Sequence, residues 1–548
     1  MRDVVVVREG GAVETAELDS GARHALAPAE FAAWAARQDP GTRWVWADTA
    51  DLYPALLAAG VRLRRAVDLR LTRRLLRGAH AVAHTALAAG PETAWDRSVT
   101  GQDEGVPSMM DDLISSTTLS LDDVITEHRA QQHALAEAKD RGQLRLLVHA
   151  ESIGALVAAE MRHAGVPFSV TVHDQQLTRI LGPKPLPGGR PALMEALCGT
   201  IREQLGAPKL NPDSPAELLK ALRAVGIEVD STRQWELEQH DHPAIAPVLE
   251  YKKLARLLTA NGWAWMNTWV HDGRFRPDWV PGGVVTGRWA SRGGGALQLP
   301  RQIRSAVRAD PGWTLVVADA AQLEPRVLAA MAGDRVMARA ARGADLYQGL
   351  VDQRVVASRP QAKLAMLGAL YGSTTGEAGA LMPRLMRAFP DAVGVVESAA
   401  RSGERGERVS TWLGRTSPYP SSGWFELQSD AQAEGAGRST VQRAGQAARE
   451  WGRFTRNFVV QGTAAEWALC WLGHLRQSLA TLAAPDGVRP ELVYFLHDEV
   501  MVHAPQECAD DVVAAVEQAA VSAGELLFGG TVEFPVQVAV CDSYDQAK

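Results

Sequence analysis

Residues 313–326 read Trp-Thr-Leu-Val-Val-Ala-Asp-Ala-Ala-Gln-Leu-Glu-Pro-Arg, and this stretch sets the expectation for the fold. The mostly apolar run over 313–318 predicts a buried strand, and a helix is expected from Gln322 to Met331. Pro325 is tolerated in the first turn of that helix, because its missing amide has no helical partner there. Asp319 follows the predicted strand, so its carboxylate is rigidly placed and suits a hard cation.

A second carboxylate lies at a predicted hairpin turn, far along the chain. Strands expected over 491–496 and 500–503 flank His497-Asp498-Glu499. Magnesium is commonly held by one or two carboxylates together with substrate phosphates. Asp319 and Asp498 therefore predict a shared site. Two ions about 3.5–4 Å apart would activate an attacking oxygen there and stabilise the leaving one.

A predicted helix between these two carboxylates carries two cations. Arg359 and Lys363 are one helical turn apart and share a face, and Tyr371 lies near that face two turns later. Such a face would neutralise a triphosphate during phosphoryl transfer. Each feature also has an ordinary interpretation: a helix cap for Asp319, a solvated face for the cations, and polar turn chemistry for 497–499.

The composition limits the class of protein. The length of 548 residues indicates two to four domains, and the 22% charged and 46% hydrophobic content is typical of a soluble globular protein. No run approaches the roughly 18 apolar residues that cross a bilayer, so we expect no membrane association. The four cysteines are scattered without a CxxC pair, which favours a reducing cytoplasm over a disulfide framework or zinc site.

The net charge of -7 does not by itself indicate nucleic-acid binding, but local patches set the field that a ligand meets. Residues 288–308 contain five arginines and no acid, and residues 62–77 contain seven arginines with only Asp68. The ordinary interpretation of a basic stretch is a solvated helix face. The second patch would either contact DNA or pack against the rest of the chain, and the sequence does not decide between them.

The rest of the chain alternates predicted elements with turn signals. Residues 1–95 have an α/β pattern, with strands at 4–7 and 44–47 and helices at 31–37 and 52–59. Residues 99–123 are expected to form a long loop or domain boundary. Further helices are expected over 124–163, from Pro215 with Ser214 as cap, over 244–260, several times within 335–400, and over 441–479 with a break near Gln461-Gly462. Residues 417–438 are expected to be an exposed loop.

In chain order, the three sites resemble motifs A, B and C of the family-A DNA polymerases. Motif A is matched by Asp319, Gln322, Glu324 and Arg326. Motif B is matched by Arg359, Lys363, Tyr371 and Gly372, with Leu367 at its aromatic position, and motif C is matched by 497–499. The resemblance covers about 150–548 and includes segments at 211–215, 250–254, 286–304, 453–465 and 543–548.

The resemblance implies an α/β N-terminal exonuclease-like (RNase H-like) domain, followed by a right-hand α+β polymerase with palm, fingers and thumb. The implied division is 1–140 for a degenerate 3′-5′ exonuclease-like domain, 141–285 for the thumb and the start of the palm, 286–335 for the palm with motif A, 336–440 for the fingers with motif B, and 441–548 for the palm with motif C.

The resemblance also implies roles for single residues. Asp319 and Asp498 would hold two Mg²⁺ ions with support from Glu499, and Arg359 and Lys363 would bind the triphosphate. Lys363 would also be the candidate proton donor to pyrophosphate. The residues implied around the incoming dNTP and primer end are Glu324 as the block to a ribose 2′-hydroxyl, Tyr371 near the templating base, His497 at the primer end, and Gln322 and Leu367.

Contacts with primer-template DNA are implied for Arg288, Gln298, Arg304, Arg453, Asn457 and Gln461. A minor-groove location suits them, because the acceptors there are nearly the same for every base pair. Leu367 departs from the family, which has an aromatic residue at this position, so the selectivity for the sugar is open.

The N-terminal region departs from an active proofreading exonuclease, which has an Asp-x-Glu after its first strand and a late Tyr-x3-Asp. Arg8-Glu9-Gly10-Gly11 follows the first strand here, and no Tyr-x3-Asp occurs before residue 150. We therefore expect an inactive domain. A 5′ nuclease region is not found, so a separate 5′ nuclease is expected. The enzyme is expected to be a monomer in the bacterial cytoplasm or nucleoid, active in repair or gap filling.

Two other functions remain to be weighed. A single-subunit RNA polymerase would share the two aspartates, the lysine and the tyrosine, but Glu324 and the 453–461 segment argue against it. A catalytically dead DNA-binding or scaffold protein is disfavoured because both carboxylates and Lys363 are present.

Overall fold

The computed structural model describes residues 2–96, 119–292, 295, 299–343, 345–372 and 376–547. It divides into two compact units. The first comprises Met1–Ala164, Trp279–Ala290 and Val316–Ala539, and the second comprises Gly165–Asp278, Ser291–Leu315 and Val540–Lys548. The finer domain boundaries given by the sequence resemblance stay predictions.

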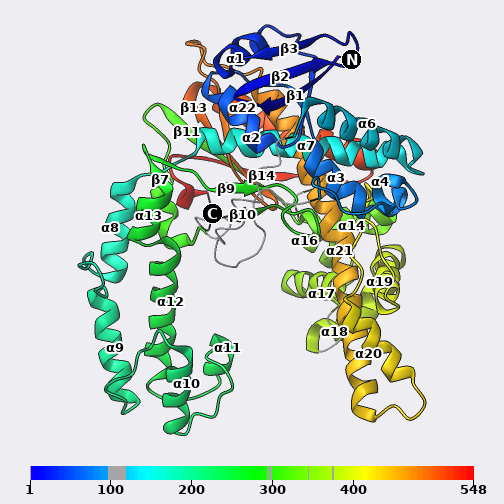
Figure 1. Cartoon of the computed structure of the whole chain (residues 1–548). Helices are drawn as coiled ribbons and strands as arrows, with labels where there is room; N and C mark the ends of the chain where they lie inside the picture. The colour runs from blue at the N-terminus through cyan, green and yellow to red at the C-terminus, as the bar shows by residue number, and fades with distance from the viewer. Residues whose placement is uncertain are drawn as a thin grey trace. The chain divides into compact units, whose positions relative to one another are not determined.

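The N-terminal part of the first unit contains a five-stranded sheet in the order β3-β2-β1-β4-β5, near the blue end of the colour range in Figure 1. β1 pairs antiparallel with β2 and parallel with β4, and β4 pairs parallel with β5. The strands are β1 (Asp3–Glu9), β2 (Ala12–Glu17), β3 (Arg23–Leu26), β4 (Arg43–Trp46) and β5 (Arg65–Asp68).

This sheet is buried on both faces, which explains the continuous valine run of β1. Val4 and Val6 pack with Leu156 of α7 in one cluster, whereas Val5 and Val7 pack with Val124 of α6 in the other. The helices of this part are α1 (Pro28–Ala36), α2 (Thr49–Ala58), α3 (Leu69–Gly78), η1 (His80–Val82), α4 (Ala86–Ala89), α6 (Leu121–Glu137) and α7 (Arg141–Ala164).

A second sheet, in the order β12-β13-β11-β14, carries the predicted carboxylates. β12 and β13 form the predicted antiparallel hairpin, with a register irregularity between Leu492 and Tyr494. The strand predicted to end at residue 318 continues to Ala320, so Asp319 lies inside it rather than after it. The strands are β11 (Trp313–Ala320), β12 (Glu491–Leu496), β13 (Glu499–Pro505) and β14 (Val536–Cys541).

The remaining helices of the first unit confirm most of the expected helical segments (Figure 1). They are α14 (Leu323–Ala332), α15 (Arg335–Ala340), α16 (Leu346–Asp352), α17 (Arg359–Tyr371), α18 (Gly376–Ala388), α19 (Pro390–Glu404), α20 (Ser422–Gln432), α21 (Arg438–Leu479), η4 (Gln506–Cys508) and α22 (Ala509–Phe528).

Three predicted elements were wrong in part. The segment 417–438 is not all loop, because Ser421 accepts a hydrogen bond from Trp424 N–H and begins α20. The break expected near Gln461-Gly462 is absent, since α21 is one helix of 42 residues. Most of the loop expected over 99–123 lies outside the described residues, and α6 already begins at Leu121.

The second unit is mainly helical, and its caps match the sequence signals. Ser214 caps α10 by accepting from Glu217 N–H, and α12 ends at Asn261 before Gly262. Its elements are β6 (Val166–Pro167), α8 (Val170–Leu181), α9 (Ala192–Gln204), α10 (Pro215–Ala224), α11 (Gln234–Leu237), α12 (Ile245–Asn261), α13 (Trp263–Trp269), β7 (Val270–His271), β8 (Arg274–Phe275), η3 (Arg301–Ala306) and η5 (Tyr544–Gln546). Two short strands, β9 (Asp278–Val280) and β10 (Ala290–Arg292), pair with each other.

Within the part of the chain that the structure describes, no helix combines the length and apolarity needed to cross a membrane. The four cysteines carry free thiols; Cys198, Cys470 and Cys508 are buried, and Cys541 is partly buried.

Candidate active site

The two predicted metal-binding aspartates lie side by side. β11 and β13 are neighbours in the sheet, and the N–H of Ala320 donates to the carbonyl oxygen of Asp498 over 2.8 Å. Adjacent strands are about 4.7–4.9 Å apart, so this hydrogen bond places Asp319 next to the turn that holds Asp498. Both aspartates are half-buried, whereas Glu499, the first residue of β13, is 4% exposed.

Two residues near the aspartates have left-handed backbone angles: Gln322, three residues after Asp319, and His497, immediately before Asp498. Gln322 has φ 49° and His497 has φ 56°, which side chains other than glycine rarely adopt. Gln322 Oε1 accepts from Leu346 N–H over 3.0 Å and so connects the start of α14 with α16. Burial lowers the pKa of His497, and the nearby Arg288 charge acts in the same direction, so this imidazole is neutral at neutral pH.

Glu324 connects three segments of the site. Its carboxylate accepts a hydrogen bond of 3.0 Å from the hydroxyl of Tyr371, on α17, and forms an ion pair with Arg288. Burial and the Glu324 charge raise the pKa of Tyr371 to about 12. The phenol therefore stays protonated and keeps donating to Glu324 throughout the neutral range.

One pocket of about 240 Å³ collects much of the predicted site. The predicted residues that line it are Arg288, Gln322, Glu324, Leu367, Tyr371, His497 and Asp498. Tyr347, which the sequence did not indicate, lines the same pocket. Ala464 and Ala465 line it too; they belong to the resembling segment 453–465 but were given no role. Tyr347 is on α16, whose only local signal is Asp345, the residue that caps this helix.

The predicted triphosphate ligands lie on α17 and are exposed. Arg359 Nε donates to a carboxylate oxygen of Asp345 over 2.6 Å, and its guanidinium lies 5.7 Å from the ring centroid of Tyr347. Hydrogen bonding to Asp345 raises the pKa of Arg359. Lys363 has no hydrogen-bond or ion-pair partner among the described residues. Neither cation lines the 240 Å³ pocket.

Arg326, in motif A, has a structural position rather than one facing a ligand. Its side chain is fully buried and donates to the carbonyl oxygens of Ala321, Gly343 and Glu533 over 2.8, 2.8 and 2.9 Å. It also donates to Ala341. Burial lowers the pKa of Arg326 to about 10. These bonds fix the loop that follows α15 against the start of α14.

Three of the predicted DNA-binding residues share one stripe of α21. Arg453, Asn457 and Gln461 follow each other at intervals of four residues and therefore lie along one face of the helix. Arg453 is exposed and the other two are half-buried. Arg304 lies in the second unit, where its guanidinium is 4.4 Å from the ring centroid of buried Tyr544. Gln298 lies outside the described residues.

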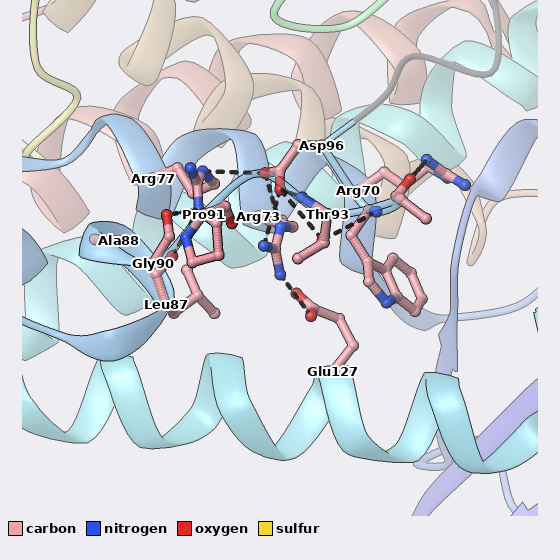
Figure 2. A network of polar contacts seen from close by, with 12 residues as sticks. Arg70, Arg73, Arg77, Leu87, Ala88, Gly90, Pro91, Thr93, Asp96 and Glu127 are labelled. Atoms are coloured by element: carbon pink, nitrogen blue, oxygen red, sulfur yellow. Dashed lines mark hydrogen bonds and ion pairs between the residues drawn. The ribbon is translucent and has the colours of Figure 1, made fainter.

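Five arginines of the 62–77 patch make contacts within the chain. Figure 2 shows three of them, Arg70, Arg73 and Arg77, and Arg62 forms an ion pair with Glu491 over 2.8 Å. Arg73 binds Asp96 over 2.8 Å and Glu127 over 2.7 Å, while Arg77 binds Asp96 over 3.1 Å. Arg70 lies over the ring of Trp95 at 5.7 Å. Arg74, outside Figure 2, donates to the carbonyl oxygens of residues 281 and 282. These five arginines pack against the chain, which is one of the two alternatives that the sequence left open.

The N-terminal carboxylates Asp48 and Asp68 act as helix caps. Asp48 accepts from Ala50 N–H at the start of α2, and Asp68 accepts from Leu71 N–H and from Thr49. Asp68 is 2% exposed, and burial next to Asp48 raises its pKa to about 7. Their contacts are those of structural residues.

The donors at the strand ends fit a divalent cation that a substrate helps to bind. Among the described residues, no three or more His, Cys, Asp or Glu side chains converge to hold a metal ion by themselves. Asp319 on β11 and Asp498 in the turn before β13 supply two half-exposed carboxylates. This donor set suits Mg²⁺, which is commonly bound by one or two carboxylates plus substrate phosphates.

Comparison with known proteins covers most of the chain. The family model described as DNA polymerase family A matches residues 192–546. The thermostable DNA polymerase I of Thermus aquaticus is 27% identical over 434 residues, which are 73% of this chain and 44% of that protein. DNA polymerase I of Chloroflexus aurantiacus is 26% identical over 335 residues, 55% of this chain and 32% of that protein. The chain thus spans less than half the length of these relatives.

A solved structure shows the same fold. The POL domain of Pol1 from M. smegmatis, in a complex with DNA primer-template and dNTP, aligns with a TM-score of 0.72 and 19% sequence identity. The alignment covers 99% of this chain and 95% of that chain.

Proposed function

Since the chain belongs to DNA polymerase family A, we propose that it is a DNA-directed DNA polymerase that adds dNTPs to the 3′ end of a primer. The observation that carries the proposal is the 2.8 Å hydrogen bond from Ala320 N–H to the Asp498 carbonyl, which keeps Asp319 on β11 beside the turn that holds Asp498. The M. smegmatis POL domain is described with DNA primer-template and dNTP. We propose the same two ligands here.

Asp319 and Asp498 would hold two Mg²⁺ ions between them, with Glu499 buried behind the turn. When bound, the ions would supply activation of the primer hydroxyl and stabilisation of the leaving pyrophosphate. The chain's own contribution would be to hold the backbones of the two aspartates next to each other before substrate arrives, since Ala320 of β11 is hydrogen-bonded to Asp498. Such preorganisation lowers the reorganisation needed during reaction.

The cations of α17 would bind the triphosphate. Arg359 is paired with Asp345 in this structure, so the incoming phosphates would have to compete with that carboxylate for the guanidinium. Lys363, one turn later, would donate a proton to the departing pyrophosphate from its ammonium Nζ. The exposure of Arg359 and Lys363 supports these roles, because a triphosphate could reach both side chains without disrupting a buried ion pair.

The pocket lining would select the nucleotide. Glu324 would block a ribose 2′-hydroxyl, and its contacts with Tyr371 and Arg288 would keep the carboxylate in that position. Neutral His497 would help to place the primer end. The residues that would contact the duplex are Arg288, Gln298, Arg304, Arg453, Asn457 and Gln461.

We propose that the N-terminal part is an exonuclease-like domain of the RNase H type without proofreading activity. Its sheet order β3-β2-β1-β4-β5, with three antiparallel strands joined to two parallel ones, supports the fold. The use of Asp48 and Asp68 as helix caps supports the inactivity. The same proposal includes a polymerase part divided into palm, fingers and thumb, with the boundaries given above. It also includes a monomeric state, a role in repair or gap-filling synthesis, and a cytoplasmic location.

Primer extension tests the proposed function. With Mg²⁺ and a primed template, the protein is expected to extend the primer with dNTPs far better than with rNTPs, and to leave a mismatched primer end undigested. Asp498→Ala should abolish extension, because one of the two carboxylates is lost, while primer-template binding measured by fluorescence anisotropy stays within about twofold.

A matched control keeps this test specific. Asp510→Ala removes an exposed carboxylate from the first turn of α22 and should leave extension unchanged. Extension that survives in Asp498→Ala would refute the assigned role, and rNTP incorporation as fast as dNTP incorporation would favour an RNA polymerase.

A further inference from the structure

A larger pocket, of about 700 Å³, lies within the first unit and away from the candidate active site. Glu491 and Leu492, at the start of β12, line it, whereas His497 and Asp498 follow the end of that strand. Strand residues advance about 3.3 Å each, so β12 separates the two places by roughly 17–20 Å. The pocket is therefore a distinct site.

The pocket is distinct from the N-terminal carboxylates as well. It contains Arg43 and Arg65, the first residues of β4 and β5. Asp48 follows the other end of β4, and Asp68 is the last residue of β5. A ligand in the pocket would thus lie at the opposite edge of the sheet from these two carboxylates.

Six arginines line the pocket, and three of them have partners within the chain. The paired ones are Arg43 with Asp3, Arg62 with Glu491, and Arg476 with Glu160. In the described chain, the other three side chains, those of Arg64, Arg65 and Arg489, have neither an ion-pair nor a hydrogen-bond partner, and all three are exposed. Arg64 and Arg65 belong to the 62–77 patch, and packing within the chain does not explain them. Arg489 comes from a distant segment.

Burial and the arginine charges lower the pKa of His149, the histidine that lines the pocket. Burial lowers the pKa of His149, and the charges of Arg43, Arg145 and Arg65 lower it further. At neutral pH this imidazole is uncharged and can accept or donate a hydrogen bond.

The rest of the wall is largely apolar. It includes Leu63, Ile153, Val157, Ala164, Leu479 and Leu492. Pockets of about 300–1,000 Å³ with apolar walls and a few convergent polar groups are typical of small-molecule sites. Unpaired arginines next to an apolar wall would bind a ligand that has an anionic part and an apolar part.

We propose that this pocket binds a small phosphorylated molecule with an apolar part, the chemical class that includes nucleoside monophosphates. Arg64, Arg65 and Arg489 would bind the phosphate, because guanidinium groups match phosphate oxygens with paired hydrogen bonds and keep their charge. The apolar part of the ligand would lie against the α7 and α21 side of the pocket, at Val157 and Leu479.

Calorimetric titration of the whole chain tests this assignment. EDTA is present, so that nucleotide binding through Mg²⁺ at Asp319 and Asp498 is suppressed. The probes are AMP, inorganic phosphate and a single-stranded oligothymidylate. AMP is expected to bind saturably and more tightly than phosphate. The double variant Arg64→Ser/Arg65→Ser should weaken AMP binding by about tenfold or more, because two charged hydrogen-bond donors are lost.

The matched control is Arg37→Ser/Arg129→Ser. It changes the net charge equally at two exposed arginines outside the pocket and should leave AMP affinity within about twofold. A second variant, Ala480→Trp, places a large ring in the pocket from the exposed C-cap of α21 and should also weaken AMP binding. Circular dichroism and primer extension check that each variant is folded.

Four results would overturn the proposal. The first is that the unmodified chain does not bind AMP, and the second is that Arg64→Ser/Arg65→Ser binds AMP with unchanged affinity. The third is that inorganic phosphate binds as tightly as AMP. The fourth is that the two arginines are needed for oligothymidylate binding but not for AMP binding. The last result would assign this surface to single-stranded nucleic acid instead.

Discussion

At the scale of single residues, both carboxylate oxygens of Glu324 in the candidate pocket have a partner. Tyr371 donates to one carboxylate oxygen over 3.0 Å, and Arg288 is paired with the other. A carboxylate held from two sides cannot move away from an added hydroxyl without losing one of these contacts. Rejection of a substrate by an unfavourable contact is a common source of specificity.

Replacement of Glu324 by alanine should relax the choice of sugar. The ratio of kcat/KM for dNTPs to that for rNTPs is expected to fall by about tenfold or more, which corresponds to only about 1.4 kcal/mol. Single-nucleotide incorporation assays measure both values. Glu426→Ala, at an exposed position of α20, should leave the ratio unchanged. An unchanged ratio in Glu324→Ala would show that another residue selects the sugar.

At the scale of elements, α21 packs closely against other segments at the place where the sequence predicted a break. A Cβ added to Gly462 would lie 2.4 Å from Thr411 Cγ2 and 3.1 Å from the Thr286 carbonyl oxygen. Glycine is weakly helix-forming in general, but here its missing side chain lets the helix approach both segments. The helix stays intact because tertiary packing outweighs local propensity.

Gly462→Ala is therefore expected to destabilise the protein, although alanine has the higher helix propensity. The loss should be about 1–3 kcal/mol, the usual range for overpacking. Gly445→Ala, in the same helix, meets only the end of the Arg449 side chain at 3.3 Å. It should stabilise by about 0.5–1 kcal/mol. Urea unfolding followed by tryptophan fluorescence compares the two, and equal effects would contradict the close packing at Gly462.

A buried carboxyl on the same helix should make stability depend on pH. Burial raises the pKa of Glu466 to about 7, and its side chain bonds Thr411 and the backbone N–H of Leu413. The folded state therefore binds the proton more tightly than the unfolded chain. The stabilisation is fully present below the ordinary carboxyl pKa of 4.5 and is lost as the pH rises through 7.

Between pH 5 and 8 the free energy of unfolding should fall by about 2–3 kcal/mol from this group, and Glu466→Gln should remove most of that fall. Trp467, the next residue, is buried and reports unfolding of this region. Asp68, with a pKa also raised to about 7, acts in the same direction, so some slope remains in the variant. Glu434→Gln is the exposed control. An unchanged slope in Glu466→Gln would place the titration elsewhere.

The sequence was sufficient to predict elements that have a periodic apolar pattern or a turn or cap residue of their own. The strand with Asp319, the hairpin with Asp498 and the cap at Ser214 all follow from apolar period and turn chemistry. α20 could not be found this way, because none of its residues is buried and it is held by Gln428, which donates to Ala444 of α21 over 2.9 Å. Such a contact between separate elements has no periodic pattern.

The candidate site shows the same division. Its aspartates, cations and glutamate were expected from the motif resemblance, but Tyr347 and the pairing of Asp345 with Arg359 were not. They depend on how α16 packs beside α17, which neither residue spacing nor composition specifies. The contacts of the arginines at 62–77 likewise depend on acidic side chains and carbonyl groups distant in sequence, such as Glu127. The sequence alone therefore did not predict them.

At the scale of the whole molecule, an acidic protein is proposed to bind a polyanion. The net charge is -7, so binding must rely on local cations such as Arg453 on α21. Each phosphate neutralised by the protein releases bound counterions, which makes affinity fall steeply with salt.

The affinity for primer-template DNA should therefore decrease linearly on a plot of log association constant against log KCl concentration. Arg453→Ala should reduce the slope by about one unit, the value for one lost phosphate contact. Arg37→Ala, an exposed arginine of the N-terminal part, should not change it. Fluorescence anisotropy at several KCl concentrations gives the slopes. A flat plot would exclude a groove that binds the DNA backbone.

Gln322, three residues after Asp319, and His497, immediately before Asp498, have left-handed backbone angles. That conformation costs a residue other than glycine roughly 1–2 kcal/mol, so glycine at either position would ease the backbone. Both side chains, however, line the 240 Å³ pocket. A redesign of this chain for heat resistance alone would thus favour the replacement of two residues that line the candidate pocket, and both positions should be held fixed in such a redesign.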